Sequence, residues 1–377
     1  MTTDVMRWRD YFLRDGQGFD NFWQSFLGER KRDVLFVIGH GFDRRMCDVV
    51  ERLLSFGGEG SRDVALISFD EGAASPSHIY SPQRKANGEY IEKLVGERGK
   101  IAHLVISIFS DEGRRVGARS IVAEFASSAE FRSYTDVVVD ISALPRGLYL
   151  PLLAKLLALF DQEPKDGIRR NLHVVVSHSP AMDGAIVEEG LEESATYLHG
   201  FAAAALEIES TSGQPRIWIP VLGKRQQIQL ERIHSLVAPD EICPLLPSPA
   251  QDPREGDSIM IEYRALLFDQ LRVEPRNIIY GDESNPFEVY RQIMRSILHY
   301  HRALIPLGGC KVALSAMSSK LASIGVLLAA YELGRREPKV TVGVAHVESQ
   351  GYRDASNVGD RVRTLYTMWL SGECYAA

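Results

Sequence analysis

The sequence contains little cysteine and no long hydrophobic run. Its 377 residues include only four cysteines, which lie far apart and form no CxxC pair: Cys47, Cys243, Cys310 and Cys374. This spacing argues against a disulfide framework and against a zinc site. No stretch of about 18 uncharged apolar residues occurs, so the sequence predicts neither a membrane span nor a secretion signal. We therefore expect a cytoplasmic protein with no membrane partner.

An excess of positive charge is also absent. Lys and Arg number 43 against 50 Asp and Glu, which gives a formal charge of −7 at pH 7. Because unspecific binding to DNA or RNA depends on cations that neutralise phosphates, general nucleic-acid binding is not expected. Hydrophobic residues make up 45% of the chain and charged residues 25%, as in ordinary folded proteins. At roughly 100–200 residues per domain, the length fits about two domains.

Aromatic residues gather close to the N-terminus. Seven of them lie between residues 8 and 30: Trp8, Tyr11, Phe12, Phe19, Phe22, Trp23 and Phe26. Their spacing predicts one or two short amphipathic helices with an aromatic face. We therefore predict that residues 1–32 form a helical N-terminal extension. The extension either packs onto the domain that follows or provides the docking segment for a protein partner.

Short apolar strands alternate with helices from residue 33 onward. The strands are predicted at 34–38, 64–69, 102–109, 136–141 and 172–177. Helices are predicted at 43–55, 87–98, 115–128, 147–161 and 187–210. This alternation is typical of an α/β fold, doubly wound around a mainly parallel sheet. We predict a first Rossmann-like domain over residues 33–210.

A second series with the same order of elements is predicted over residues 215–377. Its strands fall at 216–221, 240–243, 276–280, 311–315 and 339–345. The two series align at four anchors in order: Gly39 with Gly223, Asp111 with Asp282, Ser142 with Ser315, and His178 with His346. The hypothesis is a tandem duplication of one Rossmann-like unit.

The first candidate site is the turn GHGFDRR at residues 39–45. Ligands of open α/β sheets bind beyond the carboxyl ends of the strands. There Gly39 and Gly41 permit tight backbone geometry, and Arg44 and Arg45 offer charge for phosphate. The side chains of His40 and Asp43 add polar groups. Arg44 occupies the place of the third glycine in a dinucleotide fingerprint, so no nicotinamide or flavin cofactor is predicted. The structural alternative is a turn in which Asp43 caps the next helix.

The second candidate site is a hydroxyl-rich turn that occurs in both series. Ser142 and Arg146 lie in DISALPRG, and the counterpart LSAMSSKL supplies the candidates Ser315, Ser318, Ser319 and Lys320. Each turn places hydroxyls and a cation beside a helix N-terminus, where orphan N–H groups and the helix dipole favour anions. These turns are our candidates for phosphate recognition. Capping hydroxyls beside a solvated cation are the alternative interpretation.

Catalytic candidates are fewer. Asp111 follows the predicted strand 102–109, and His178 follows the strand 172–177. Together with Asp43 they are candidate acids, bases or metal ligands. No metal site is predicted from spacing, and Mg²⁺ becomes a candidate cofactor only if the protein is an enzyme. The structural alternative is that Asp111 simply begins a helix.

Two segments resemble CARF-type sensor domains. They are HRALIPLGGCKVALSAMSSKLASIGVLLAAYEL and DVVVDISALPRGLYLPLLAKLL, in which a strand leads through a small-residue, hydroxyl-rich turn into an apolar helix. CARF domains and the related SAVED domains, built from two fused CARF-like units, bind cyclic or linear oligonucleotide signals in prokaryotic antiviral defence. The resemblance covers about residues 33–347 and implies that this turn lines a ligand pocket. It also implies an output through a protein partner.

Three functions remain open on the sequence. The first is a sensor or accessory protein that binds a nucleotide-like or phosphorylated ligand in a cleft between the repeats. The second is an enzyme acting on nucleotides or sugar phosphates, with one active and one degenerate repeat, because the first half has HGFD and SHS where the second has LGKR and AHV. The third is a scaffold subunit of a multiprotein complex.

Overall fold

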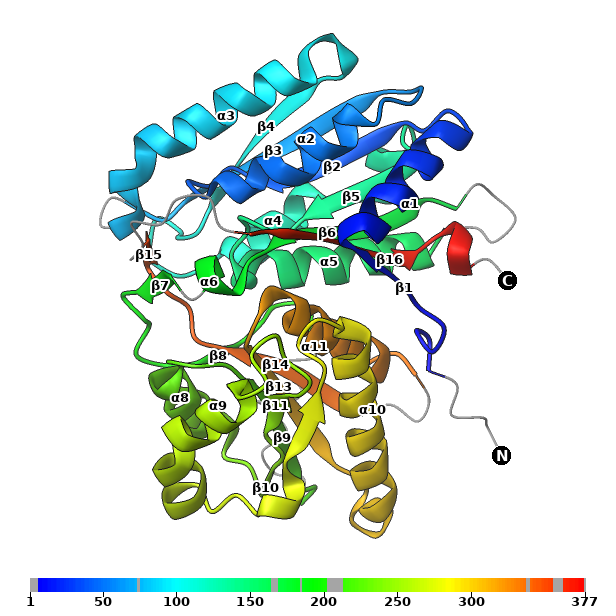
Figure 1. Cartoon of the computed structure of the whole chain (residues 1–377). Helices are drawn as coiled ribbons and strands as arrows, with labels where there is room; N and C mark the ends of the chain where they lie inside the picture. Colours follow the sequence, from blue (N-terminus) through cyan, green and yellow to red (C-terminus); the bar gives the residue numbers. More distant parts are fainter. Residues whose placement is uncertain are drawn as a thin grey trace. The chain divides into compact units, whose positions relative to one another are not determined.

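The protein divides into two compact units, each built around its own sheet (Figure 1). The computed structural model describes residues 6–72, 75–163, 169–183, 185–201, 213–336, 340–354 and 362–375. Unit 1 comprises residues 1–10 and 191–348, and unit 2 comprises residues 11–190 and 349–377. The chain therefore passes from one unit to the other three times.

The sheet of unit 2 has a parallel centre and an antiparallel border. Its strands are β1 (Phe12–Asp15), β2 (Val34–Gly39), β3 (Arg62–Asp70), β4 (Ile101–Ser107), β5 (Asp136–Asp140), β6 (Asn171–His178) and β16 (Thr364–Ser371). They follow the order β1-β16-β6-β5-β2-β3-β4. The strands from β6 to β4 pair in parallel, whereas β16 pairs antiparallel with both β6 and β1.

Helices cover both faces of this sheet. They are α1 (Gly16–Glu29), α2 (Asp48–Ser55), α3 (Ser81–Val95), α4 (Gly117–Glu124) and α5 (Arg146–Asp161). Val34, Phe36 and Ile38 of β2 pack into a core with side chains of α1, α2 and α3. Leu35 and Val37 are buried as well and point to the opposite face, because side chains alternate along a strand. Figure 1 shows α4 and α5 on that face.

Unit 1 contains a second sheet of the same kind. Its strands are β8 (Thr196–Tyr197), β9 (Arg216–Leu222), β10 (Glu241–Ile242), β11 (Leu245–Pro247), β12 (Ile279–Gly281), β13 (Lys311–Met317) and β14 (Thr341–His346). The order is β12-β11-β9-β13-β14-β8, with β10 paired to β9. Its helices are α8 (Gln227–Val237), α9 (Glu255–Arg264), α10 (Pro286–Ala303) and α11 (Lys320–Leu333).

Five parallel strands in each sheet have the same order. The first of the five, β2 or β9, lies at the centre; β3 and β4, or β11 and β12, extend one way, and β5 and β6, or β13 and β14, extend the other way. An antiparallel strand then borders the fifth strand, β16 on β6 and β8 on β14. The predicted α/β class with mainly parallel, Rossmann-like sheets is confirmed. His178 and His346, aligned in the sequence, are the last residues of the two fifth strands. The origin of the units by duplication remains our hypothesis.

The compact units do not follow the predicted domain ranges. Residues 362–375 were expected in the second domain, yet β16 lies inside the sheet of unit 2. The predicted helix at 187–210 is wrong in its described part, where β7 (Ile186–Glu189) and β8 form instead, and its remainder from 202 lies outside the described residues. β7 pairs antiparallel with β15 (Gly351–Asp354), so cross-strand pairing replaces helical hydrogen bonding there.

The N-terminal aromatic residues belong to the cores of the two units. Trp8 is fully buried in unit 1, edge-on to Tyr290 with ring centroids 5.6 Å apart. Phe19, Trp23 and Phe26 of α1 are buried in the core of unit 2. The predicted separate extension over residues 1–32 is therefore corrected, because burial of these rings makes the segment part of both cores. The buried rings are not available as a docking surface for a partner.

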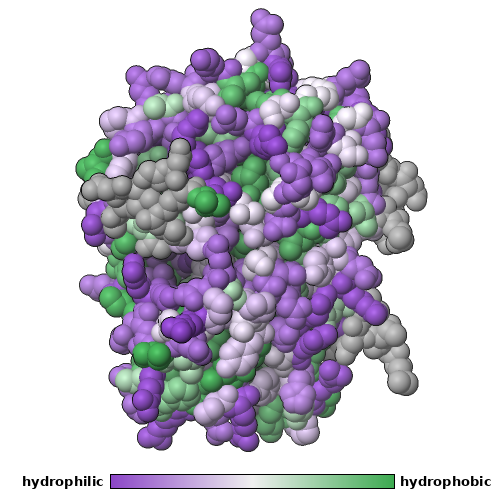
Figure 2. Space-filling view, viewed as in Figure 1, coloured by the Kyte–Doolittle hydropathy of each residue, from purple (hydrophilic) through white to green (hydrophobic). Residues whose placement is uncertain are grey.

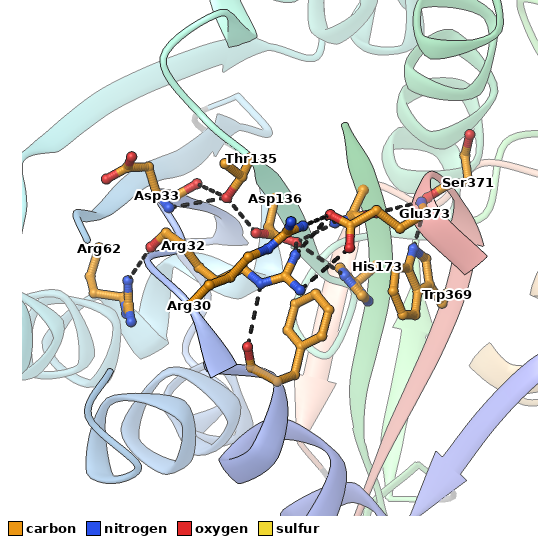
Figure 3. A network of polar contacts seen from close by, with 12 residues as sticks. Arg30, Arg32, Asp33, Arg62, Thr135, Asp136, His173, Trp369, Ser371 and Glu373 are labelled. Atoms are coloured by element: carbon orange, nitrogen blue, oxygen red, sulfur yellow. Dashed lines mark hydrogen bonds and ion pairs between the residues drawn. The ribbon is translucent and has the colours of Figure 1, made fainter. Parts of the chain in front are cut away.

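A buried charge network lies at the amino ends of the central strands of unit 2 (Figure 3). Arg32 is 2% exposed and Asp136 is fully buried; Arg32 Nη1 lies 3.6 Å from Asp136 Oδ1 and donates to Glu373 Oε1 at 3.0 Å. His173 Nε2 lies 3.6 Å from the same Asp136 oxygen. Burial would raise the pKa of Asp136, but His173 and Arg32 lower it. Because Glu373 lies just after β16, its contact with Arg32 holds the segment that follows β16 against this network.

Within the described residues, no helix combines the length and the apolar character needed to cross a bilayer. On the face drawn in Figure 2, hydrophobic and hydrophilic residues are interspersed rather than gathered into one broad apolar area.

Candidate functional site

Two predicted turns of unit 2 meet at the carboxyl edge of its sheet. A Cβ atom added to Gly39 would lie 2.9 Å from the side chain of Leu144, and one added to Gly41 would lie 3.1 Å from Ala143. The turn after β2 therefore touches the turn after β5. The order of the strands reverses between these two strands, and ligands of open α/β sheets bind at such a reversal.

The equivalent turns of unit 1 meet in the same way. A Cβ atom added to Gly223, which follows β9, would lie 2.5 Å from the backbone oxygen of Met317 and 3.1 Å from the Cα of Ser318. Here too the strand order reverses, between β9 and β13. The close approach that glycine permits is thus present at both reversal points.

A buried arginine organises the reversal point of unit 2. The side chain of Arg45 is 1% exposed; its Nε donates to Asp43 Oδ2 at 2.8 Å and its Nη1 donates to Asp183 Oδ1 at 2.6 Å. Burial would lower the pKa of Arg45, but the two carboxylates raise it further above its ordinary value. Arg45 therefore stays charged and holds Asp43 in place. Asp43, a predicted catalytic candidate, is therefore ion-paired with Arg45 and is not available as a free base.

His178 lies on the other side of Asp183. Its Nδ1 is 3.2 Å from Asp183 Oδ2, and α6 (Pro180–Asp183) carries the carboxylate just after the histidine. Burial would raise the pKa of Asp183, but its close contact with His178 and the charge of Arg45 lower it to about 2. The carboxylate is therefore ionised at neutral pH and lies beside the imidazole, although the pair does not have the geometry of a regular hydrogen bond. Two catalytic candidates, Asp43 and His178, are thus joined through Arg45 and Asp183.

A second ion pair continues the cluster. Ser177 Oγ donates to Asp48 Oδ2 at 2.6 Å, and Arg363 Nη1 donates to Asp48 Oδ1 at 3.1 Å. Burial raises the pKa of Asp48, and the hydrogen bond from Ser177 and the charge of Arg363 offset part of this increase. The predicted ligand residue Ser142 also turns inward: it is buried, and its Oγ accepts a hydrogen bond from Ser177 N at 2.8 Å. Its hydroxyl thus joins the turn after β5 to β6.

The remaining candidates after β2 have different surroundings. His40 has both ring nitrogens in hydrogen bonds, Nδ1 with Ser68 Oγ and Nε2 with the backbone oxygen of Arg84, each 2.9 Å long. Burial lowers the pKa of His40, so the ring joins β2, β3 and α3 as a neutral group. Arg44 is 44% exposed, and its guanidinium lies 3.8 Å from the ring centroid of Tyr90. It stands at the surface, outside the Asp43 cluster.

Arg146 begins α5 at the reversal point, as the sequence predicted for a cation beside a helix N-terminus. Its side chain is 16% exposed, and Nη1 lies 3.9 Å from Glu188 Oε1 of β7. Burial would lower the pKa of Arg146, but Tyr149, Glu188 and Tyr352 raise it, so the guanidinium is charged and has partners within the fold. The amino end of α5, the two turns and Arg146 therefore come together in one place where an anion is favoured.

The candidates in unit 1 lie around the start of α11. Ser315 is fully buried within β13, and its hydroxyl accepts a hydrogen bond from Trp218 Nε1 at 2.9 Å, which commits it to the core. Ser319 is the N-cap, with its Oγ accepting from Ala322 N at 3.1 Å. Ser318 and Lys320 flank that cap. The turn is therefore a capped helix start, which was the structural alternative.

Asp111 lies apart from the other catalytic candidates. It is exposed in the turn between β4 and α4, and β4 is the outermost strand of the sheet. The carboxylate does not begin a helix, because α4 starts at Gly117. Among the described residues, no group of three His, Cys, Asp or Glu side chains could hold a metal ion.

Sequence reasoning missed Asp183 and Asp48, and it offered Arg45 only as a phosphate-binding charge beside Arg44. Arg45 and Arg44 are adjacent, and only the short 3₁₀ helix from Arg44 to Cys47 turns Arg45 inward. Asp183 and Asp48 gave no signal of their own in the sequence. The run SHSPAMD, in which Asp183 follows His178 after a proline, was the one available hint.

Comparisons with known proteins give no family. No family model matches the sequence, and no curated protein matches it. One similar solved structure is a Type III CRISPR defence DNA nuclease activated by cyclic oligoadenylate, with 12% identity, a TM-score of 0.46 and coverage of 78% of this chain. The chain spans 63% of the length of that nuclease. Another is a universal stress protein from Archaeoglobus fulgidus, with 10% identity, a TM-score of 0.23 and coverage of 84% of this chain and 97% of that one. Neither similarity is close enough to identify a function.

Proposed function

We propose that the protein is a binding module, a sensor or accessory protein that recognises a nucleotide-like or phosphorylated ligand. The site lies at the carboxyl edge of the sheet of unit 2, between the turn 39–43 and the turn 141–146. The observation that carries the proposal is the contact of Gly39 with Leu144 at the reversal of strand order, repeated by Gly223 with Met317 in unit 1.

The charges at this edge favour binding over catalysis. Asp43 is held by Arg45, which removes it as a free base. Arg146 and the N–H groups at the start of α5 are the groups that attract a phosphate. The buried cluster beneath fixes the turns in place, so a ligand meets a preorganised surface.

Differential scanning fluorimetry of the full chain tests the proposal. The probes are AMP, ATP, linear and cyclic oligoadenylates and inorganic phosphate, with cyclic oligoadenylates first because of the CARF-like segments. A ligand that binds only the folded protein raises the melting temperature. Isothermal titration with the probe that gives the largest shift then measures the dissociation constant.

A matched pair of variants locates the site. Arg146→Gln should weaken binding about tenfold or more, since a charge-assisted contact to phosphate is lost. Lys155→Gln removes a cation from the same helix away from its start and should leave the affinity unchanged. Equal affinity in both variants, or no thermal shift with any probe, would refute the proposal.

A second candidate function rests on the pair of His178 and Asp183. The carboxylate of Asp183 lies 3.2 Å from Nδ1, close enough that a small adjustment would let it orient the imidazole for general acid–base catalysis. The nucleophile of such a reaction would be water or a substrate group. Turnover of the nucleotide probes, followed by chromatography and lost in His178→Gln while binding persists, would establish an enzyme. Binding without turnover in the unmodified protein would exclude this second candidate for those probes.

A further inference from the structure

The ribbon formed by β7 and β15 lies where the chain passes between its two units. The chain leaves unit 2 between residues 190 and 191, just after β7, and it returns between residues 348 and 349, just before β15. Figure 1 shows the two strands side by side. Backbone hydrogen bonds continue the pairing: Glu192 N donates to Glu348 O at 2.8 Å, and Gln350 N donates to Gly190 O at 3.0 Å. The ribbon therefore holds the two crossing segments together.

One face of the ribbon is turned towards Arg146. Glu188 of β7 and Tyr352 of β15 are directly opposite each other in the register, so their side chains share a face. Glu188 Oε1 lies 3.9 Å from Arg146 Nη1, and the two side chains are 18% and 16% exposed, so water screens the pair only weakly. Burial would lower the pKa of Arg146, but Glu188 and Tyr352 are among the groups that raise it. The cation that we assign to phosphate recognition thus already has a carboxylate beside it.

The other strand of the ribbon, β15, is held by different contacts. Tyr352 N donates to Ser77 Oγ at 3.0 Å, and Asp354 N donates to Tyr80 Oη at 3.0 Å. These bonds join backbone N–H groups to hydroxyls, so none of the bonded groups is charged. A phosphate beside Arg146 leaves them in place. Its effect on the ribbon is therefore expected in β7 rather than in β15.

We propose that Glu188 competes with the phosphate of the ligand for Arg146, and that its displacement loosens β7 when the ligand binds. This regulation rests on the proposed function, because it acts at the same site. A phosphate is anionic and can form two parallel hydrogen bonds with a guanidinium, which makes it a stronger partner than a carboxylate 3.9 Å away. The bound phosphate then repels the like charge of Glu188. Since the ribbon carries both chain crossings, its loosening provides a route from the ligand site to the rest of the chain.

Isothermal titration of the full chain tests the competition. The probe is whichever of AMP, ATP, a cyclic oligoadenylate and inorganic phosphate gives the largest thermal shift. Glu188→Gln keeps the size of the side chain and removes its charge, so this variant should bind the probe about fivefold or more tightly. Glu189→Gln is the control, because Glu189 pairs with Arg353 and its side chain points to the opposite face of β7. The control should bind with unchanged affinity.

Hydrogen exchange of the unmodified protein tests the loosening of β7 without any variant. Binding of the same probe should speed exchange in peptides that contain residues 186–189, and peptides that contain residues 351–354 should change less. Glu188→Gln should show the faster exchange before the probe is added. If Glu188 had a merely structural role, its replacement would also loosen β7 but would leave the affinity for the probe unchanged.

The outcomes distinguish a failed competition from a failed ligand site. No thermal shift with any probe in the unmodified protein would refute the proposed function and the competition with it. Equal affinity of the unmodified protein and Glu188→Gln, or binding without faster exchange in residues 186–189, would overturn the competition and leave the ligand site standing. If Glu188→Gln fails to fold, as judged by circular dichroism, the exchange measurement on the unmodified protein decides.

Discussion

Arg45 donates a hydrogen bond of 2.6 Å to Asp183, a residue 138 positions further along the chain. The same guanidinium holds Asp43, two residues before it, so a single buried cation neutralises two carboxylates from separate elements. The arrangement fastens the turn after β2 to the segment after β6, on the side of the sheet where we place the ligand.

The first prediction concerns this cation. Arg45→Met should lower the free energy of unfolding by about 3–5 kcal/mol, because it leaves the carboxylates of Asp43 and Asp183 unpaired in a partly buried place. Urea denaturation measures the change. Arg44→Met is the control: its side chain is 44% exposed, and we expect a loss of no more than about 1 kcal/mol. Equal losses in the two variants would contradict the cluster as described.

Acid stability provides the second prediction. The pKa of Asp183 is lowered to about 2 in the folded protein, below its ordinary value of 3.8. Its stabilising contribution is therefore complete above about pH 4 and is lost as the pH falls through about 2. Between these limits the unmodified protein should lose about 2 kcal/mol more than Asp183→Asn does. Unfolding free energies at several pH values measure this, and parallel curves for the two proteins would speak against it.

The third prediction contrasts two arginines that bind the same carboxylate. Arg32 and Arg30 both contact Glu373, but Arg32 is buried beside Asp136, whereas the side chain of Arg30 is 56% exposed. Arg32→Met should cost about 3–5 kcal/mol, because Asp136 keeps its charge without its cation. Arg30→Met should cost no more than about 1 kcal/mol. Thermal and chemical denaturation of the two variants measures the difference, which should vanish if the network of Figure 3 does not form.

The fourth prediction separates the N-terminal segment from a docking role. Trp23 is fully buried in the core of unit 2, so Trp23→Ala should cost about 3–5 kcal/mol of stability. Deleting residues 1–32 removes β1, α1 and the buried Trp8, and it should leave a protein without a cooperative thermal transition. A well-folded deletion variant that has merely lost a protein partner would restore the scaffold interpretation.

The buried parallel strands could be predicted because their residues are apolar without interruption. VLFVIG of β2 and DVVVD of β5 lie between helices on both faces, and continuous apolar runs bounded by polar residues or glycine indicate such strands. The same alternation predicted the turns that follow the strands. The order of the strands within the sheet could not be predicted, because it is set by pairing between distant segments.

The rest of the fold depends on long-range contacts that leave weak local signals. β16 returns to the sheet of unit 2 after the whole of unit 1, and TLYTMWLS alone does not reveal that destination. The choice between Arg44 and Arg45 depends on the direction of one 3₁₀ turn. Ser142 and Ser315 were chosen as ligand groups for their hydroxyls, yet both hydroxyls accept hydrogen bonds within the fold. The sequence pattern therefore predicts which turns follow the strands more readily than it predicts the orientation of their side chains.

Hydrogen exchange with and without the probe that gives the largest thermal shift tests the central claim most directly. Mass spectrometry of peptides from the full chain reports which backbone N–H groups a ligand protects. We predict protection concentrated in residues 39–46 and 141–150, where the turn after β2 meets the start of α5, and its loss in Arg146→Gln. Protection confined to other segments, or the same protection in Arg146→Gln, would contradict a ligand site at this edge.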